Sequence, residues 1–462
     1  MTHDPSPGRS TRDRALRALI ACYEGRQFGR QFLAQEQAAA PLPSGDAALA
    51  VELVMGTNRH RITAEHVAKH WYRGRWAGLK VPVRVILALA IYQLCWLERI
   101  PDYAAIDQAV RQAKRYGRSA AALVNALLRK VATSRGPLIA RPEDADVQCF
   151  LPVDDQRGRV FGDRILPHPA RRPLDYLVAA MGHPPWLVER WHRRFKPDLC
   201  RQICLAGQRR PPLVLRPNLL RCTVDELSDR LASAGYRPRR IEGTDAVALP
   251  NAPTLAVLPE FHEGLCQPQD STAQIAVALA APQRGEFVLD YCAGAGTKAT
   301  QAAEQMGNDG LVIATDINPE PLDRAAENAE RLGIDILRTV HLNQLDDALS
   351  AAGRRPDVIL VDAPCTNTGV LARRPEARFR ASHRSMMELV DVQRSIFKQA
   401  VAHAGPQTRL IYSTCSLEEE ENEQQIAWFC DEHAGWRAMQ TVFTTPDADR
   451  DGGFAAVLTP AS

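Results

Sequence analysis

Between residues 287 and 416 the chain alternates short apolar stretches with longer amphipathic ones. Each apolar stretch runs into an Asp or a Ser, and the stretches are 287–289, 311–315, 357–361 and 410–412. Short apolar strands that alternate with helices are typical of a parallel sheet covered by helices on both faces. We therefore expect a doubly wound, Rossmann-like α/β domain over residues 266–462.

The first 135 residues show a different pattern. From residue 11 onward, apolar residues recur at helical spacing, which predicts an all-helical domain over 1–135. Within it, the stretch after Pro101, residues 102–131, has no internal proline and one break signal, Gly117, and is expected to form one helix or two consecutive helices.

Two further segments lie between these domains. Residues 136–172 are rich in Pro, Arg, Asp and Gly without a sustained period, and we interpret them as a linker or insertion. Residues 173–265 mix strand and helix patterns, which predicts a small α+β subdomain. The stretch 171–216 has ten basic against three acidic residues, interleaved with Trp186 and Trp191, so we expect this subdomain to bind RNA.

Overall composition excludes some classes of protein. The 462 residues include 57 Lys and Arg against 54 Asp and Glu, a net charge of +3, so a nucleic-acid signal must be local. The longest apolar run, about 85–92, is too short for a bilayer, and residues 1–14 lack the apolar core of a secretory signal. We expect a cytoplasmic protein. Its eleven cysteines are expected to be thiols, and no CxxC pair predicts a metal site.

One local basic cluster lies in the helical domain. Arg111, Lys114, Arg115 and Arg118 follow one another at i, i+3, i+4 and i+7, which places them on one helix face. Such a face is either solvated or a contact for RNA phosphates.

A glycine-containing turn follows the first strand of the α/β domain. The strand ends at Asp290, and CAGAGTK (292–298) leads into the next helix, where glycine allows close approach of a ligand to free N–H groups. Asp316 ends the second strand, where a carboxylate can accept the ribose hydroxyls of an adenosyl ligand. Because Ala299 breaks the GxGxxG spacing, S-adenosylmethionine is favoured over NAD. The alternative is a structural turn with an exposed Asp.

Two cysteines follow later strands. Cys365 ends Asp-Ala-Pro-Cys and Cys415 lies in Ser-Thr-Cys-Ser, so both fall at the carboxyl edge of a parallel sheet. Carbon 5 of cytosine is a poor nucleophile, and its methylation requires a thiolate to add at carbon 6. A second thiol or a carboxylate can then assist proton loss and release. Two inert buried cysteines are the alternative.

At these residues the chain resembles the NOL1/NOP2/Sun family of RNA cytosine-5 methyltransferases. The likeness rests on DAPC followed by TGV, TCS followed by Glu420, Glu421 and Asn422, and PQDSTAQ at 268–274. The helical segments IYQLCWLERIPDYAAIDQAV and LVNALLRKV also resemble the NusB-like RNA-binding domain of bacterial ribosomal RNA members. The resemblance covers nearly the whole chain apart from 136–172.

The resemblance implies roles for individual residues. Cys415 corresponds to the nucleophile, Cys365 to the cysteine that assists product release, and Asp362 to a carboxylate near the methyl donor and the base. Asp316 corresponds to the ribose ligand. The corresponding cofactor loop consists of Cys292, Ala293, Gly294, Ala295, Gly296, Thr297 and Lys298.

The chain departs from the family pattern at two places. The usual loop CAAPGGKT is CAGAGTKA here, with Ala295 and Thr297 in place of Pro and Gly. Where the family offers an Asp to the adenine, this chain has Asn343 or Gln344. An amide oxygen accepts a weaker hydrogen bond than a carboxylate, so we expect lower cofactor affinity.

The implied activity is methylation of cytosine C5 in small-subunit ribosomal RNA through a covalent Cys–cytosine C6 adduct. Four arginines after the DAPC motif, Arg373, Arg374, Arg378 and Arg380, could hold RNA phosphates or form a solvated loop. Two other functions remain open at this point: a transfer RNA methyltransferase, and a non-catalytic RNA-binding or ribosome-assembly factor. The sequence does not identify protein partners.

Overall fold

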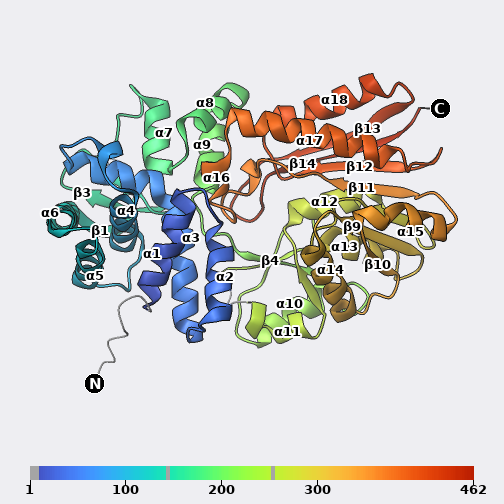
Figure 1. Cartoon of the computed structure of the whole chain (residues 1–462), viewed down its shortest axis with the longest axis horizontal. Coiled ribbons are helices and arrows are strands. Elements are labelled where there is room, and N and C mark those ends of the chain that lie inside the picture. Colours follow the sequence, from blue (N-terminus) through green and yellow to red (C-terminus); the bar gives the residue numbers. More distant parts are fainter. Residues whose placement is uncertain (1–9, 142–145, 251–254, 462) are drawn as a thin grey trace. The chain divides into compact units, whose positions relative to one another are not determined.

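The computed structural model describes residues 10–141, 146–250 and 255–461. The chain divides into two compact units. Unit 1 consists of Met1–Arg209 and Arg374–Arg380, and unit 2 of Arg210–Arg373 and Ala381–Ser462. Figure 1 colours unit 1 mainly blue to green and unit 2 mainly yellow to red.

Unit 1 begins with helices, as the sequence predicts. They are α1 (Thr11–Tyr23), α2 (Gly29–Ala39), α3 (Ser44–Trp71), α4 (Val81–Trp96), α5 (Asp102–Lys114) and α6 (Arg118–Ser134), with the 3-10 turn η1 (Trp76–Gly78). Helix α4 is the most apolar of these, and its residues 85–95 are all buried. A helix that is apolar on every side is buried on every side, so α4 forms the centre of this bundle.

The break between α5 and α6 changes the expected basic face. Gly117 has a φ of +118° and caps α6, so the chain turns there and does not continue as one helix. Arg111 and Lys114 belong to α5, Arg115 caps its end, and Arg118 begins α6. The prediction that Arg118 shares one helix face with the other three residues is therefore wrong, because it lies in a different helix. All four side chains are exposed.

The segment predicted as a linker contains a small sheet. Strands β1 (Arg135–Ala140), β2 (Phe150–Pro152) and β3 (Arg157–Phe161) pair in the order β1-β3-β2, all antiparallel. Phe150, Leu151 and Phe161 are buried. These strands are too short and too rich in Arg, Gly and Pro to show a two-residue period, so sequence pattern alone did not predict them. Helices α7 (Pro173–Met181), α8 (Pro185–Arg194) and α9 (Pro197–Ala206) follow.

A short segment from late in the sequence completes unit 1. It contains α16 (Ala377–Arg380), and Arg378 is fully buried. The guanidinium of Arg378 donates to the backbone carbonyls of Arg59, Gly182 and Gly207 at 3.0, 2.8 and 2.8 Å. Arg378 therefore has a structural role, and the expectation that it contacts phosphate is wrong, because none of its side chain is exposed.

Unit 2 starts with a small antiparallel sheet. Its order is β5-β6-β4-β7, formed by β4 (Leu213–Pro217), β5 (Arg239–Arg240), β6 (Val247–Leu249) and β7 (Cys266–Pro268). Helix α10 (Val224–Ser233) covers it, and its first turn is held by a capping box between Thr223 and Glu226. The short elements η2 (Leu255–Val257) and α11 (Pro259–His262) lead into β7. The mixture of strand and helix predicted for residues 173–265 is present here in β4 and α10.

A seven-stranded sheet in the order β10-β9-β8-β11-β12-β14-β13 forms the larger part of unit 2. Its strands are β8 (Phe287–Asp290), β9 (Leu311–Asp316), β10 (Leu337–His341), β11 (Val358–Asp362), β12 (Arg409–Thr414), β13 (Trp436–Thr444) and β14 (Gly453–Pro460). The first five are mutually parallel, which confirms the predicted α/β domain. Strand β14 is antiparallel to both β12 and β13, a hairpin that the sequence reasoning did not anticipate.

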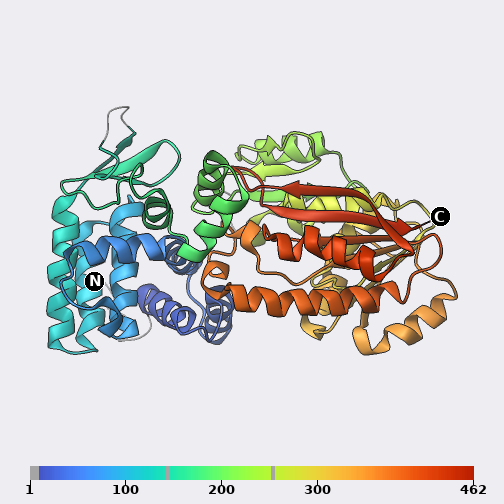
Figure 2. The same cartoon turned by 90° about the horizontal axis from the view of Figure 1, so that it is seen from above.

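Helices cover both faces of this sheet. One face packs on α12 (Ser271–Ala280), α13 (Thr297–Gln305) and α14 (Pro319–Leu332), through small residues such as Ala299 and Ala303. The other face packs on α15 (Leu345–Ala352), α17 (His383–Val401) and α18 (Glu423–Glu432), through larger ones such as Phe397 and Phe429. Helices α17 and α18 lie side by side (Figure 2). None of the helices in the described part of the chain has the length and apolarity needed to span a membrane.

Candidate active site

The sheet order places the site. Strand β8 has β9 on one side and β11 on the other. The strands after β8 therefore extend the sheet first on one side of it, with β9 and β10, and then on the other side, with β11 and β12. Ligands of open α/β sheets bind at such a switch point, outside the carboxyl ends of the strands. At that edge the structure brings together Asp290, Asp316, Asp362 and Cys415, which end or follow β8, β9, β11 and β12.

The loop 292–298 has the geometry of a ligand cradle. Gly294 has a φ of +51°, and a Cβ placed on it would meet no heavy atom within 4 Å, so this backbone borders open space. Its N–H donates to Oδ2 of Asp316 at 3.0 Å. Gly296 has a φ of +72° and caps α13, and a Cβ there would lie 2.7 Å from the Cβ of Ala325. Only glycine satisfies both conditions at position 296.

These residues fit an adenosyl ligand. The open backbone at Gly294 can approach a ligand closely, and the amino end of α13 offers N–H groups. Asp316 is half-buried at the end of β9, and the side chain of the next residue, Ile317, is 69% exposed. Ile317 offers an apolar surface for a flat base beside a carboxylate for a ribose. It was not predicted, because an isolated Ile after a strand carries no sequence signal.

The segment expected near the adenine forms the turn η3 (Leu342–Gln344) after β10. Asn343 is exposed, and its Oδ1 lies 2.7 Å from Nδ1 of His341. Nε2 of His341 donates to the carbonyl of Ile317 at 2.9 Å. His341 therefore connects the turn that carries Asn343 to the residue after Asp316.

A buried cation connects the loop to the DAPC motif. Nζ of Lys298 lies 2.6 Å from Oδ2 of Asp362, and Ser413 donates to Oδ1 of the same carboxylate at 2.8 Å. Burial disfavours the charge of Lys298, but the negative charges of Asp362, Asp290 and Cys415 outweigh burial, and its pKa is raised. Lys298 therefore remains a cation between the cofactor loop and the cysteine site.

Asp290 is a buried carboxylate that sequence reasoning left without a role. It is 1% exposed, and its carboxylate has no side-chain hydrogen-bond partner among the described residues, although the backbone N–H of Ala299 is directed at it. Burial raises the pKa of Asp290 to about 7, with Lys298 opposing the shift and Asp362 adding to it. A buried carboxyl group without a side-chain partner at the end of β8 is available to a donor from a bound ligand.

The two cysteines expected to converge are in contact. Sγ of Cys365 lies 3.2 Å from Sγ of Cys415, although the residues are 50 positions apart. The hydrogen bond with Cys415 and burial raise the pKa of Cys365 well above its ordinary value. Cys365 therefore stays protonated and can donate a hydrogen bond to Cys415. Sγ of Cys415 also lies 3.2 Å from Oδ1 of Asn367.

A buried carboxylate holds the two cysteine loops together. Glu421 lies in the turn η5 (Glu419–Glu421) and is fully buried. It accepts from the N–H and hydroxyl of Thr366, next to Cys365, and from the hydroxyl of Ser416, next to Cys415, at 2.5 Å. Asn422 adds a bond from Nδ2 to the carbonyl of Ser416 at 2.9 Å. The residues after TCS thus fix the distance between the two thiols.

Arg373 has partners within unit 2. Its Nε donates to Asp451 at 2.7 Å, its Nη2 to Asp270 at 2.9 Å and its Nη1 to the carbonyl of Pro212 at 2.8 Å. This guanidinium is bound by two carboxylates, contrary to the expectation of a phosphate contact. Arg374 is exposed, so its proposed contact with RNA stays a prediction.

Within residues 10–141, 146–250 and 255–461, no three His, Cys, Asp or Glu side chains are arranged to hold a metal ion. All eleven cysteines lie in these ranges and are free thiols.

Three family models match the chain. The model of 16S rRNA methyltransferase RsmB/F matches residues 276–459, the NusB family matches 9–133, and the ferredoxin-like domain of RsmF/B-like methyltransferases matches 183–255. Together with the fold, these matches define the class: a methyltransferase with a Rossmann-like catalytic domain, a small α+β subdomain and a NusB domain.

Within that class, the chain belongs to the ribosomal RNA small subunit methyltransferase B family. It is 31% identical over 421 residues to Ribosomal RNA small subunit methyltransferase B of Erwinia tasmaniensis, covering 88% of this chain and 89% of the relative. It is 29% identical over 426 residues to the Probable ribosomal RNA small subunit methyltransferase B of Bacillus subtilis, covering 92% and 89%. The family resemblance seen in the motifs is confirmed.

Solved structures share the fold. The crystal structure of PH0851 aligns with a TM-score of 0.71 at 21% identity and covers 96% of this chain and 98% of that one. A methyltransferase homolog protein from Pyrococcus horikoshii aligns with a TM-score of 0.55 at 24% identity and covers 63% of this chain and 99% of that one. At these identities the likeness extends to the fold alone.

We predict that Glu421→Gln lowers turnover while it leaves cofactor affinity unchanged. The amide would direct N–H groups at the hydroxyls it should accept from, and a shift of about 1 Å between catalytic groups can cost about 100-fold in rate. Methyl transfer measured under saturating cofactor should show kcat lower by about 10- to 100-fold. Glu419→Gln, an exposed residue of the same turn, is the control. Equal kcat values for the two variants would contradict this role for Glu421.

A second prediction concerns pH. Between its ordinary pKa and about 7, Asp290 binds a proton in the folded chain but not in the unfolded one, so stability falls as pH rises through this window. Asp290→Asn removes that dependence. The melting temperature of the variant minus that of the wild type should therefore increase from pH 5 to pH 8, without ligand. Asp323→Asn, at an exposed site on α14, should show no such trend. A constant difference for Asp290→Asn would refute the shift.

Proposed function

We propose that this protein transfers a methyl group from S-adenosylmethionine to carbon 5 of a cytosine in small-subunit ribosomal RNA. The observation that carries the proposal is the 3.2 Å contact between Cys365 and Cys415 at the edge of the sheet where the cofactor loop lies. Family membership supports the substrate class, because the relatives are ribosomal RNA small subunit methyltransferases by name.

The residues that would hold S-adenosylmethionine surround the switch point. Asp316 would bind the ribose, the turn at Asn343 would lie beside the adenine, and Asp362 would lie near the methyl-bearing end. The rest of the cradle is the loop of Cys292, Ala293, Gly294, Ala295, Gly296, Thr297 and Lys298. When bound, the cofactor supplies an electrophilic methyl group.

In the first step, Cys415 acts as the nucleophile. Its thiolate adds to C6 of the cytosine and forms an S–C6 bond, and the electron pair of the C5–C6 double bond becomes available at C5. The charge of Lys298 interacts with that of Cys415, and the Cys365 thiol can donate a hydrogen bond to the Cys415 sulfur. The electron pair at C5 would then form the bond to the methyl carbon, and the electron pair of the broken methyl–sulfur bond would remain on the sulfur of the donor.

The second step releases the product. The proton on C5 leaves to a base, its electron pair restores the C5–C6 double bond, and the S–C6 bond breaks with its electrons returning to Cys415. We assign assistance in this step to Cys365, whose thiol lies against Cys415: its proton can pass to the departing sulfur of Cys415, and the thiolate then left on Cys365 can accept the proton from C5. Asp362, held by Lys298 and Ser413, is positioned at the same edge.

RNA contact is proposed for the exposed basic residues of unit 1. Arg111, Lys114 and Arg118 are exposed near the junction of α5 and α6, and Arg374 is exposed in the late segment of unit 1. Arg111 pairs with the exposed Asp107 at 3.2 Å, and Arg115, which is also exposed, pairs with the buried Asp13 at 3.0 Å. The NusB match over 9–133 supports RNA binding by these helices.

Replacement of each cysteine should have a different effect on methyl transfer and on the covalent enzyme–RNA adduct. Cys415→Ala should abolish methyl transfer because no thiolate can add to C6, with cofactor affinity unchanged. Cys365→Ala should instead accumulate a covalent enzyme–RNA adduct, visible as a slowly migrating band on a denaturing gel. The assay uses tritium-labelled methyl transfer to unmethylated small-subunit ribosomal RNA and, in parallel, to unmodified transfer RNA, followed by bisulfite mapping.

Each result of that assay separates one alternative. Label at a single cytosine of ribosomal RNA supports the proposal, and label only in transfer RNA would retain the chemistry and replace the substrate. Turnover by Cys415→Ala would refute the nucleophile. Absence of label in both RNAs would favour a non-catalytic RNA-binding or assembly factor.

The basic residues predict a change in salt dependence. Each phosphate contact contributes about 0.7 to 0.9 to the slope of log affinity against log salt. Replacement of Arg111, Lys114 and Arg118 by Gln should therefore reduce the magnitude of the slope by about 2 to 3. The control replaces three exposed arginines of unit 2, Arg284, Arg324 and Arg354. An equal slope for the triple variant and the wild type would exclude these three phosphate contacts.

A further inference from the structure

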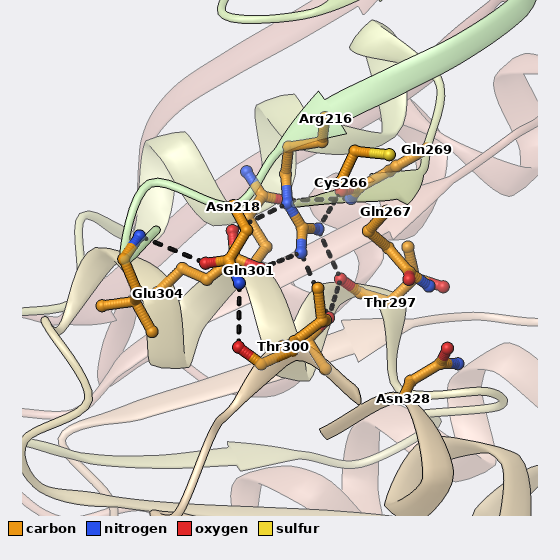
Figure 3. A network of polar contacts seen from close by, with 12 residues as sticks. Arg216, Asn218, Cys266, Gln267, Gln269, Thr297, Thr300, Gln301, Glu304 and Asn328 are labelled. Carbon is orange, nitrogen blue, oxygen red and sulfur yellow. Dashed lines mark hydrogen bonds and ion pairs between the residues drawn. The ribbon is translucent and has the colours of Figure 1, made fainter. Parts of the chain in front are cut away.

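A buried arginine outside the catalytic edge has every donor satisfied. Arg216 lies in β4 of the small sheet and is 4% exposed. Its Nε and Nη2 donate to the carboxylate of Glu304 at 3.1 and 2.7 Å. Its remaining donors reach Gln269, the carbonyl of Thr297 at 2.9 Å and the hydroxyl of Thr300 at 3.2 Å. Figure 3 shows this guanidinium at the centre of the network.

The contact with Thr297 connects Arg216 to the cofactor loop. Thr297 is the first residue of α13 and belongs to the loop 292–298, and the next residue, Lys298, pairs with Asp362. Glu304 and Thr300 lie further along the same helix. Arg216 therefore binds α13 at its first residue, one turn later and near its end, and fixes the helix along its length.

Other side chains extend this support. Nε2 of Gln269 donates to Oε1 of Gln301 at 2.8 Å, and Nε2 of Gln301 donates to the carbonyl of Gln274 at 3.0 Å. The PQDSTAQ segment, which the catalytic chemistry does not use, thus joins Arg216 to α13. Figure 3 shows Gln269 and Gln301 beside the guanidinium.

A second connection reaches the middle of the loop. Nδ2 of Asn328 donates to the carbonyl of Ala295 at 3.2 Å, and Oδ1 of Asn328 accepts from Arg331 at 3.1 Å. Arg331 in turn donates to the carbonyl of Cys266 in β7 at 3.0 Å. The small sheet therefore supports the loop at Ala295 as well as at Thr297.

Stability alone does not explain why the ion pair between Arg216 and Glu304 is buried here. A buried salt bridge is often no more stabilising than apolar residues of similar volume. What an apolar pair lacks is a donor for the carbonyl of Thr297. Arginine provides five N–H groups in a planar fork and can bind acceptors from several segments at once, which lysine cannot.

We propose that Arg216 is a positioning residue for the methyl donor: through Thr297, Thr300 and Glu304 it holds the start of α13 where the loop's N–H groups can bind the ligand. This inference rests on the proposed function. It assigns to the small subdomain, matched over 183–255 by a ferredoxin-like family model, a part in cofactor binding.

The test compares two double variants of the full-length protein. Arg216→Met with Glu304→Met removes the ion pair but keeps apolar volume. The matched control, Arg409→Met with Glu286→Met, removes a 2.6 Å ion pair at the opposite, amino-terminal edge of the sheet. Circular dichroism and melting temperature establish folding, and calorimetric titration gives the Kd for S-adenosylmethionine.

We expect the first variant to raise the Kd and the KM for S-adenosylmethionine about tenfold, with kcat at saturating donor within about twofold of the wild type. In the ligand-free protein, amide exchange in residues 292–298 should be faster. The control variant should change neither the Kd and KM for S-adenosylmethionine nor the amide exchange of residues 292–298. Arg216→Lys keeps the positive charge of the pair but loses the planar fork of N–H donors, so it should raise the Kd for S-adenosylmethionine by an intermediate factor. This single variant provides the test if the double variant does not fold.

The outcomes separate this inference from the proposed function. Failure of the wild type to bind S-adenosylmethionine would overturn the proposed function and this inference with it. If the wild type binds and the folded Arg216 variants bind equally well, with unchanged amide exchange in the loop, the positioning role is overturned and the proposed function stands.

Discussion

Parallel pairing of β8, β11 and β12 is the constraint on which the site depends. Because Leu360 pairs with Asp290 in one direction and with Ile411 in the other, the three strands end at the same edge. Residues separated by more than 100 positions in sequence thereby lie at one site. The positions of the aspartates and cysteines follow from this register, since a slip of one residue in any strand would turn its side chains to the other face.

Buried polar groups then fix what the strands bring together. Glu421 binds the residues next to both cysteines, Lys298 binds Asp362, and Arg216 binds the helix that follows the cofactor loop. Each of these groups costs free energy to bury, and each is fully hydrogen-bonded or paired with opposite charge. Asp290 is the exception, a buried carboxyl group with no side-chain partner among the described residues, and it lies where the ligand is expected.

The two units differ in where the charged side chains described above lie. Unit 1 is built from helices around the apolar α4 and presents basic side chains to solvent near α5 and α6. In unit 2, the charged side chains Lys298 and Asp362 at the sheet edge are paired with each other. Arg373 and Arg378 illustrate the difference between a basic sequence and a basic surface, since both are bound by protein acceptors in spite of the arginine-rich sequence around them.

The sequence by itself determined the class of the two main folds and the residues at the strand ends. These features are local patterns, which involve residues close together in the sequence and can therefore be recognised from it. They are the helical periodicity, the alternation of strands with helices, and the positions of Gly296, Cys365 and Cys415. Tertiary structure decided the rest: the break at Gly117, the sheet within 135–161, the β13–β14 hairpin, and the partners of Arg216 and Glu421. These depend on hydrogen bonds between residues far apart in sequence, whose donors and acceptors meet only once the strands and helices have packed.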